Sequence, residues 1–318
     1  MWGEIMEKEE RNEKGFEIYV ESMAKSADDK TGRIIPILRR ALENQKGDIL
    51  DMGTGGGELT QALLLVAKEF DVKVFALDRD PRMIKILKEK FKKEKKAKIL
   101  KADIENFKPK KKFAAVVCCS IMHEIFSEEK NTEDVKSTLR NIHNALLPGG
   151  LIIIRDGAKP TPENDMVLLQ PLKKELFEKF QEILNFTGVQ WTKIQDCHNL
   201  NRIRVFLAIS KENAYELAVK YQYPEINWPI ELKEKFGFWT KEEAKSILEE
   251  IGFEMINLES YLLPYFAEMF AKDFKIFKWQ DGPACVAEAT SARRRPGAVE
   301  IPYFDTHLII AAQKEKRG

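Results

Sequence analysis

The chain has 318 residues, of which 44% are hydrophobic and 32% are charged, and its 52 Lys and Arg residues are balanced by 51 Asp and Glu residues. The length allows two ordinary domains or one enlarged domain with a sizeable hydrophobic core. A net charge of +1 argues against a partner recognised mainly through bulk charge, such as nucleic acid or an anionic membrane surface. No apolar run is long enough to span a membrane, and residues 1–10 lack the pattern of a secretory signal, so we expect a cytoplasmic protein.

The spacing of cysteines and histidines argues against disulfides and metal sites. Cys118 and Cys119 are adjacent and the other cysteines stand alone, which favours reduced thiols. The sequence has no Cys-x-x-Cys and no His-Glu-x-x-His motif, and its histidines lack metal-ligand spacing. We therefore predict no bound metal.

Predicted strands and helices alternate between residues 47 and 156. The run at 113–119 is continuously apolar, which is typical of a strand covered on both faces. The alternation indicates an α/β protein with a parallel, doubly wound sheet. Apolar runs predict strands at 48–52, 72–77, 97–100, 113–119 and 151–155, and helical spacing predicts helices at 58–70, 81–92 and 132–147.

After residue 156 this alternation is interrupted twice. We therefore expect the extra length to form a cap on one sheet domain rather than an independent domain. Helical patterns occupy 164–185 and 212–221 and a strand pattern occupies 204–209, before a helix from 240, a strand at 253–258 and a last strand at 306–312. The predicted parts are an N-terminal helical segment (1–46), an alternating core (47–156), an inserted cap (157–239), and a C-terminal part of the core sheet (240–318) with a second insertion (259–305).

The most informative segment spans residues 50–59, Leu-Asp-Met-Gly-Thr-Gly-Gly-Gly-Glu-Leu. It joins a predicted strand to a helix, and its glycines let the backbone turn sharply and approach a ligand closely. Gly53 and Gly55 fit the first half of a dinucleotide fingerprint, but Glu58 stands where the third glycine belongs and would repel a pyrophosphate. The Lys-Ser/Thr pair of a P-loop is also missing. The segment indicates a nucleotide-type pocket without a phosphate cradle.

The pattern Asp51-x-Gly53-x-Gly55-x-Gly57 resembles motif I of the class I S-adenosylmethionine-dependent methyltransferases. Residues 147–150, Leu-Pro-Gly-Gly, are similar to the turn before the fifth strand of that family. The resemblance covers about 47–156, 239–258 and 306–312. It implies a Rossmann-like, seven-stranded, mostly parallel sheet with an inserted cap, and S-adenosyl-L-methionine as the cofactor.

The resemblance also implies which residues hold the cofactor. Asp78 ends the second strand, where an acidic residue of the family binds the ribose hydroxyls. Asp103 follows the third strand, where the family's Asp meets the adenine amino group and the next residue lies beside the ring. The predicted cofactor-binding residues are Tyr19, Asp51, Gly53, Thr54, Gly55, Gly57, Asp78, Arg79, Asp103, Ile104, Cys119 and Ser120. For Tyr19, packing against the sheet is an equal alternative.

The three aspartates at strand ends also have a simpler interpretation, because Asp often caps the turn that follows it. The cofactor has a sulfonium cation, an amino-acid head and ribose hydroxyls, which together call for acceptors such as Asp51, Asp78 and Asp103. Their positions at successive strand ends, on the carboxyl edge of one sheet, favour a site over independent caps.

For the transfer itself, His123 is the first candidate for a base because it follows the fourth predicted strand, where the pocket should open. Glu124, Arg155 and Asp156 are second candidates at strand ends. The alternative is that His123 packs or caps the turn before the next helix. No Asn/Asp-Pro-Pro-Tyr follows the fourth strand, so the sequence does not resemble the branch that methylates amino-purines or glutamine amides.

The sequence thus predicts an enzyme that transfers a methyl group in line to an oxygen, nitrogen or carbon of a small organic acceptor. Two alternatives are an RNA or protein methyltransferase that uses the Lys-rich stretch 85–112, and a catalytically silent cofactor-binding protein. The aromatic residues between 221 and 239 either line an acceptor pocket or form a core under the cap. The oligomeric state stays open.

Overall fold

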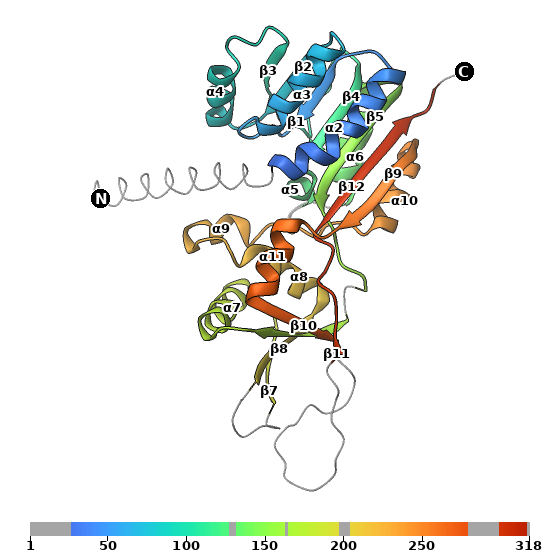
Figure 1. Ribbon diagram of the computed structural model, residues 1–318. Helices are drawn as coiled ribbons and strands as arrows, with labels where there is room; N and C mark the ends of the chain where they lie inside the picture. Colours follow the sequence, from blue (N-terminus) through green and yellow to red (C-terminus); the bar gives the residue numbers. More distant parts are fainter. Residues whose placement is uncertain (1–26, 127–131, 163–164, 197–203, 279–298, 317–318) are drawn as a thin grey trace, which may run out of the picture. The chain divides into compact units, whose positions relative to one another are not determined.

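The computed structural model describes residues 27–126, 132–162, 165–196, 204–278 and 299–316 (Figure 1). These residues form two compact units. The first unit contains the described residues up to Gly157, Lys241–Ser260 and those from His307 onward. The second contains Ala158–Thr240 and Tyr261–Thr306, so both interruptions of the sequence pattern contribute to it.

The first unit is built on a seven-stranded sheet with the order β3-β2-β1-β4-β5-β12-β9. Neighbours from β3 to β5 pair in parallel, whereas β12 runs antiparallel to β5. The predicted seven-stranded, mostly parallel sheet is therefore confirmed. Its strands are β1 (Ile49–Met52), β2 (Val74–Asp78), β3 (Ala97–Lys101), β4 (Phe113–Cys119), β5 (Leu146–Gly157), β9 (Phe253–Tyr261) and β12 (His307–Lys314).

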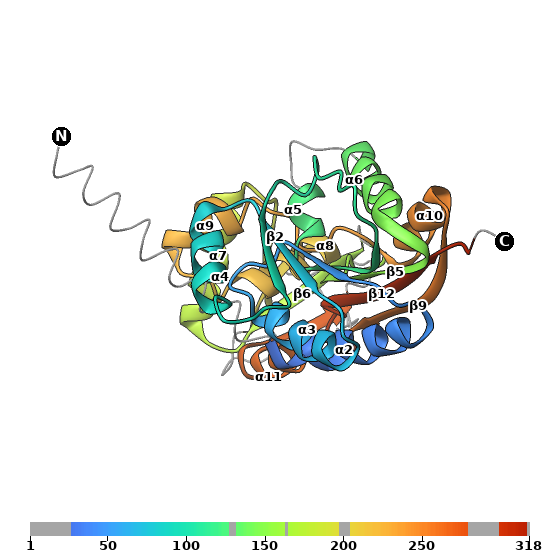
Figure 2. The ribbon, with the colours of Figure 1, turned by 90° about the horizontal axis from the view of Figure 1, so that it is seen from above.

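Helices cover both faces of this sheet, with α2 and α3 on one face and α6 and α10 on the other (Figure 2). The core strand β1 is buried along its whole length, and α2 contributes Ile34, Leu38 and Leu42, which are spaced to lie on one helix face. The helices are α2 (Ala27–Asn44), α3 (Glu58–Glu69), α4 (Pro81–Lys90), α5 (Met122–Phe126), α6 (Thr132–Ala145) and α10 (Lys241–Ile251).

The second unit has a sheet of its own with the order β11-β10-β6-β8-β7, in which all neighbours are antiparallel. Strand β10 comes from the second insertion and pairs with β6 from the first. The strands are β6 (Met166–Pro171), β7 (Thr192–Asp196), β8 (Arg204–Ser210), β10 (Phe274–Lys278) and β11 (Val299–Glu300). They are accompanied by α7 (Lys174–Thr187), α8 (Lys211–Lys220), η1 (Glu225–Asn227), α9 (Trp228–Glu231) and α11 (Pro264–Asp273).

Two predictions for the insertions are wrong. Residues 166–171 form strand β6 rather than the start of a helix over 164–185, because Val167 and Leu169 are buried in pairings with β8 and β10. The second insertion, 259–305, shows no regular pattern in the sequence and is expected to be irregular, but it contains α11, β10 and β11. In both places the strands are specified by partners distant in the sequence, which the local apolar pattern does not reveal.

Most of the aromatic residues between 221 and 239 are buried, and Trp228 also lines a cavity beside α7. Tyr221 packs edge-on against Phe180 and Phe274, with ring centroids 5.4 and 6.1 Å apart. Phe238 and Trp239 are both 2% exposed and lie 4.5 Å apart between centroids. Tyr221 and Trp228 belong to the hydrophobic core of the second unit, which favours the core interpretation for these two rings.

Gly57, at the start of α3, provides a test of packing in the first unit. Its φ of +79° belongs to the left-handed region, and an added Cβ would lie 2.6 Å from Leu87 Cδ2 and 2.8 Å from Phe91 Cε2. Gly149 has nearly the same φ, +78°, but its Cβ would meet the ends of two side chains, Lys316 at 3.1 Å and Gln45 Oε1 at an ordinary contact distance of 3.5 Å.

We expect Gly57→Ala to lower the free energy of unfolding by about 1–3 kcal/mol more than Gly149→Ala, because both carry the same backbone strain and only the first overpacks the core. Denaturant unfolding followed by circular dichroism measures the difference. Equal losses in the two variants would contradict the packing argument.

Candidate functional site

The glycine loop after β1 lies at the carboxyl edge of the first unit's sheet, where the strand order changes direction between β1 and β4. The backbone N–H groups of Gly53 and Thr54 both donate to Leu77 O, at 2.9 and 3.1 Å. Gly53 has a φ of +72°, and an added Cβ would lie 2.6 Å from Ile121 Cγ1. Glycine at this position therefore allows the loops after β1 and β4 to meet.

Asp51 is the most deeply buried acid of this loop, at 1% exposure. Thr60 Oγ1, on α3, donates to its Oδ2 at 2.6 Å. Burial raises the pKa of Asp51 to about 7, against the lowering effects of the Thr60 hydrogen bond and the Lys30 charge. The side chain is thus poised to ionise when a cation approaches.

Asp78, at the end of β2, holds two loops together. Its Oδ2 accepts from Gly55 N at 2.9 Å, and its Oδ1 accepts from Asp80 N at 2.9 Å. A carboxylate has about four acceptor positions, so these bonds leave room for ligand hydroxyls. Shaping the loop and binding a ligand are compatible roles for this residue.

Asp103 makes the local bond that its simpler interpretation predicts, because its Oδ1 accepts from Glu105 N at 3.0 Å. Ile104 is buried at 6% exposure. Asn141 Nδ2, on α6, donates to Glu105 O at 3.0 Å and fixes this turn from the neighbouring helix. Capping by Asp103 therefore positions the segment after β3.

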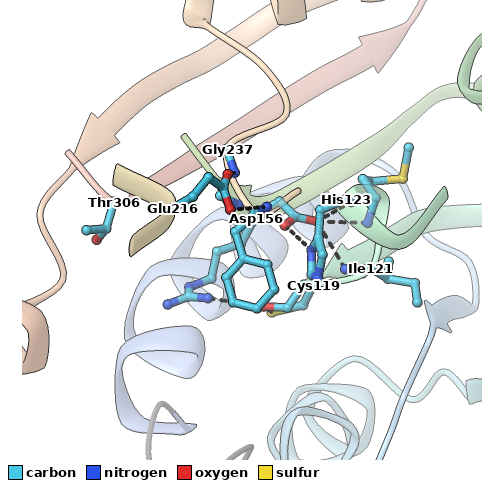
Figure 3. Close-up of polar contacts among 12 residues, drawn as sticks. Cys119, Ile121, His123, Asp156, Glu216, Gly237 and Thr306 are labelled. Carbon is cyan, nitrogen blue, oxygen red and sulfur yellow. Dashed lines mark hydrogen bonds and ion pairs between the residues drawn. The ribbon is translucent and has the colours of Figure 1, made fainter. Parts of the chain in front are cut away.

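Asp156, at the end of β5, organises the turn after β4 (Figure 3). Its Oδ2 accepts from the backbone N–H groups of Ile121 and Met122 at 3.0 and 2.8 Å, and its Oδ1 accepts from Gly157 N at 2.8 Å. Although burial works to raise its pKa, His123 and these N–H groups hold the pKa of Asp156 below its usual range. The carboxyl group is therefore ionised at neutral pH.

His123 lies in α5 and contacts the same carboxylate, with Nδ1 2.6 Å from Asp156 Oδ1 (Figure 3). The ring is 9% exposed. An ionised carboxylate only accepts hydrogen bonds, so Nδ1 donates to Asp156, and Nε2 is the nitrogen that carries a lone pair whenever the imidazole is neutral. The arrangement of a carboxylate that orients a histidine is one that general bases use.

The remaining predicted residues are arranged around this turn. Glu124 pairs with Arg79 at 3.6 Å, so these two predicted residues contact each other. Ser120 has a φ of +54°, which is unusual for a residue with a side chain, and its N–H donates to Arg155 O at 2.8 Å. Cys119, with a half-buried side chain, precedes it.

Sequence reasoning missed Thr60, Asp29 and His307. Thr60 contacts Asp51, whereas Asp29 in α2 bonds to Arg155 Nε and Nη2 at 3.1 and 2.7 Å. The pKa of His307 lies well below its usual range because of burial and because of the positive charge of Arg155. None of the three belongs to a motif, and their sequence distance from their partners leaves no local signal.

Among the predicted site residues, Tyr19 lies outside the described part of the chain. Within the described ranges, no group of three or more His, Cys, Asp or Glu side chains is arranged to hold a metal ion. The same described residues contain no helix with the length and hydropathy that crossing a membrane requires.

Comparisons with known proteins match part of the first unit. Residues 49–150 match the model of a family described as a methyltransferase domain, a range that includes every described residue of the predicted cofactor set. No curated protein matches the chain.

Similar solved structures include an S-adenosylmethionine-dependent methyltransferase from Clostridium acetobutylicum, at 13% identity and a TM-score of 0.46, covering 88% of this chain and 89% of that one. Another is a [4+2]-cyclase, at 14% identity and a TM-score of 0.45, covering 88% and 81%. A third is an S-adenosylmethionine-dependent methyltransferase from Methanosarcina mazei, at 12% identity and a TM-score of 0.46, covering 89% of this chain and 98% of that one.

Asp78→Asn tests the ribose contact. We expect S-adenosylmethionine to bind about 10- to 100-fold more weakly, because the variant loses a charge and one of its acceptor atoms. Calorimetric titration measures this, with Asp71→Asn as the control, since that side chain is 95% exposed and pairs with Lys96. Unchanged affinity in Asp78→Asn would remove the residue from the site.

Asp51 predicts a pH dependence of cofactor binding. A raised pKa means that much of the carboxyl group is protonated near pH 7, and a bound cation favours the ionised form, so binding releases protons and affinity increases as the pH rises through about 7. Titrations in buffers with different ionisation enthalpies count these protons. We expect the Asp51→Asn variant to release fewer protons on cofactor binding than the unaltered protein. An equal number would contradict the role of Asp51 in this pH dependence.

Proposed function

We propose that this chain, which belongs to the class I S-adenosylmethionine-dependent methyltransferases, moves the methyl group to an oxygen, nitrogen or carbon of a small organic acceptor that loses a proton in the reaction. Its cofactor is S-adenosyl-L-methionine, and it is an enzyme. The acceptor class, the base and the residues of the binding site are the proposed part, as is a cytoplasmic location.

The observation that carries the proposal is the buried pair of His123 and Asp156. The 2.6 Å contact orients the ring, and the ionised carboxylate stabilises an imidazolium. Such a pair suits acceptors whose reacting atom bears a proton, including hydroxyls, amines and acidic C–H groups. An acceptor without such a proton has no use for a base.

The residues at the carboxyl edge of the first unit's sheet fit the cofactor that the family uses. When bound, S-adenosylmethionine supplies a methyl group activated by a sulfonium cation, together with hydroxyls and an amino-acid head. The loop offers carboxylates from Asp51 and Asp78, and the Glu58 carboxylate is paired with Lys90 at 3.0 Å. This acceptor-rich set suits a cation with hydroxyls and does not suit a pyrophosphate.

We assign distinct roles to the predicted residues. Asp51 compensates the positive charge of the cofactor, Asp78 and Arg79 meet the ribose region, and Asp103 and Ile104 the adenine. The glycines and Thr54 bring the backbone close, and Cys119 and Ser120 lie beneath the methionine part. His123 Nε2 takes the proton of the acceptor while Asp156 holds the ring, and Glu124 stabilises the turn through its pair with Arg79.

The second unit, which includes the predicted cap 157–239, is the part that we assign to acceptor recognition. Its sequence accounts for most of the length beyond the cofactor-binding core. Insertions into a catalytic domain are a common source of substrate specificity, because loops and added elements can vary without disturbing the hydrophobic core.

The lysines of 85–112 have a structural explanation other than RNA binding. Several are paired with acids, including Lys96 with Asp71 at 2.6 Å and Lys111 with Asp48 at 2.8 Å. Lys98 and Lys101 lie on β3, an edge strand of the sheet, where charged side chains prevent pairing with other chains. This supports a small acceptor over a nucleic acid.

His123→Ala tests the proposed base. We expect turnover to fall by about 10²- to 10⁴-fold while S-adenosylmethionine affinity changes little, because the ring acts on the acceptor proton. The assay incubates methyl-labelled S-adenosylmethionine with a cell metabolite extract and follows labelled products by mass spectrometry. His143→Ala is the control, since that ring packs against Phe253 at 4.9 Å.

Three results would contradict the proposal. Full turnover in His123→Ala would leave the histidine a structural residue. Label that enters the RNA or protein fraction instead of small molecules would favour the macromolecular alternative. Cofactor binding by the unaltered enzyme without any S-adenosylhomocysteine would favour a silent binding protein.

A further inference from the structure

We infer that Asp29 is a positioning residue for the reaction: its ion pair with Arg155 fixes the first turn of α2 to the end of β5 and thereby holds the turn that carries His123. This inference rests on the proposed function, since it concerns how the base is placed. Asp29 lies outside the sequence motifs and outside the matched family range.

The contact is well formed and buried. Arg155 Nε and Nη2 both donate to Asp29 Oδ2, at 3.1 and 2.7 Å, and Arg155 is 1% exposed. Arg33, one turn along α2, donates from Nε to Asp29 Oδ1 at 3.1 Å. A guanidinium this deeply buried requires a compensating charge, because desolvation of an unpaired ion is very costly.

Besides Asp29, Arg155 bonds to Ser120, the first residue of the turn after β4 that leads to His123. Its backbone O accepts from Ser120 N at 2.8 Å, and its Nη1 donates to Ser120 Oγ at 3.4 Å. These bonds accompany the left-handed backbone of Ser120, with a φ of +54°. The next residue, Asp156, holds Ile121 and His123. Two consecutive residues at the end of β5 thus fix the whole turn.

Within the described residues, the first turn of α2 has no buried apolar side chain to hold it in place. The buried apolar residues of this helix begin only at Ile34, and the residues before it are exposed or half-buried. Gly32 weakens the helix locally, and Pro36 lacks the N–H that would bond to the Gly32 carbonyl. The position of this turn therefore depends strongly on the bonds of Asp29.

The turn also brings charge to the cofactor edge. The positive charge of Lys30 lowers the pKa of Asp51, which otherwise is raised by burial, and the charges of Lys30 and Arg33 act on His307.

Asp29→Asn, with Asp28→Asn as its matched control, tests the inference. Asp28 is the exposed neighbour in the same helical turn. In the assay with labelled S-adenosylmethionine and cell metabolite extract, we expect Asp29→Asn to lower turnover by about 10-fold or more with cofactor affinity within about threefold of the unaltered enzyme. Asp28→Asn should leave both unchanged, and Asp29→Glu, which keeps the charge, should restore part of the turnover.

A double-variant cycle separates positioning from a purely structural role. If Asp29 acts through His123, Asp29→Asn should have little further effect on turnover in a His123→Ala background. All assays are run well below the measured melting temperatures. If Asp29→Asn does not fold, Asp29→Glu replaces it in the same cycle. We then expect Asp29→Glu to lower turnover in the otherwise unaltered enzyme and to have no further effect on turnover in the His123→Ala variant.

Normal turnover in Asp29→Asn, or an additive loss in the double variant, would overturn the inference. So would equal losses of turnover and cofactor affinity, which would indicate that Asp29 serves the cofactor site instead. Failure of the proposed base is a separate result: full turnover in His123→Ala alone would refute that assignment whatever Asp29→Asn does.

Discussion

The buried carboxylate of Asp156 is the interaction on which the candidate site depends. A charge at 1% exposure is tolerable only when hydrogen bonds surround it, and the donors here are the backbone of the turn after β4 and the ring of His123. These bonds link the position of the turn, the orientation of the imidazole and the ionised state of the acid. A change to any of them disturbs the others, which makes the turn rigid in the way that a positioned base requires.

Asp51 and Asp156 show how environment separates two acids that are equally buried. Both are 1% exposed and both end strands of the same sheet, yet burial raises the pKa of Asp51 to about 7 while that of Asp156 stays below its usual range. The difference follows from the donors. Asp51 receives a hydroxyl from Thr60, whereas Asp156 receives several backbone N–H groups and an imidazole. One acid is suited to respond to an arriving cation, and the other to remain a fixed negative charge.

Sequence alone predicted the parts of the fold that are written locally. The strands and helices from β1 to β5 have strong periodicity, and Asp51, Asp78 and Asp103 stand at strand ends that a doubly wound sheet must bring to one edge. What it could not provide are contacts between distant segments: Asp156 with His123, and Asp29 with Arg155. The prediction for residues 166–171 failed for the same reason, since β6 exists through its pairing with β8 and β10. The glycine motif was readable because its requirement is a property of its own backbone.

The second unit illustrates why a sheet of this type accepts long insertions. The chain leaves the first unit after β5, returns for α10 and β9, leaves again and returns at β12. Strands β5 and β12 pair directly, with Gly157 opposite His307. Within the second unit the corresponding ends are bonded to one another, because Ala158 N donates to Thr306 O at 3.1 Å and Lys159 N to Trp239 O at 2.7 Å. Closely spaced ends let an inserted unit fold on its own core without straining its host. The acceptor-recognition role that we assign to this unit can therefore vary while the carboxylates of the cofactor edge stay in place.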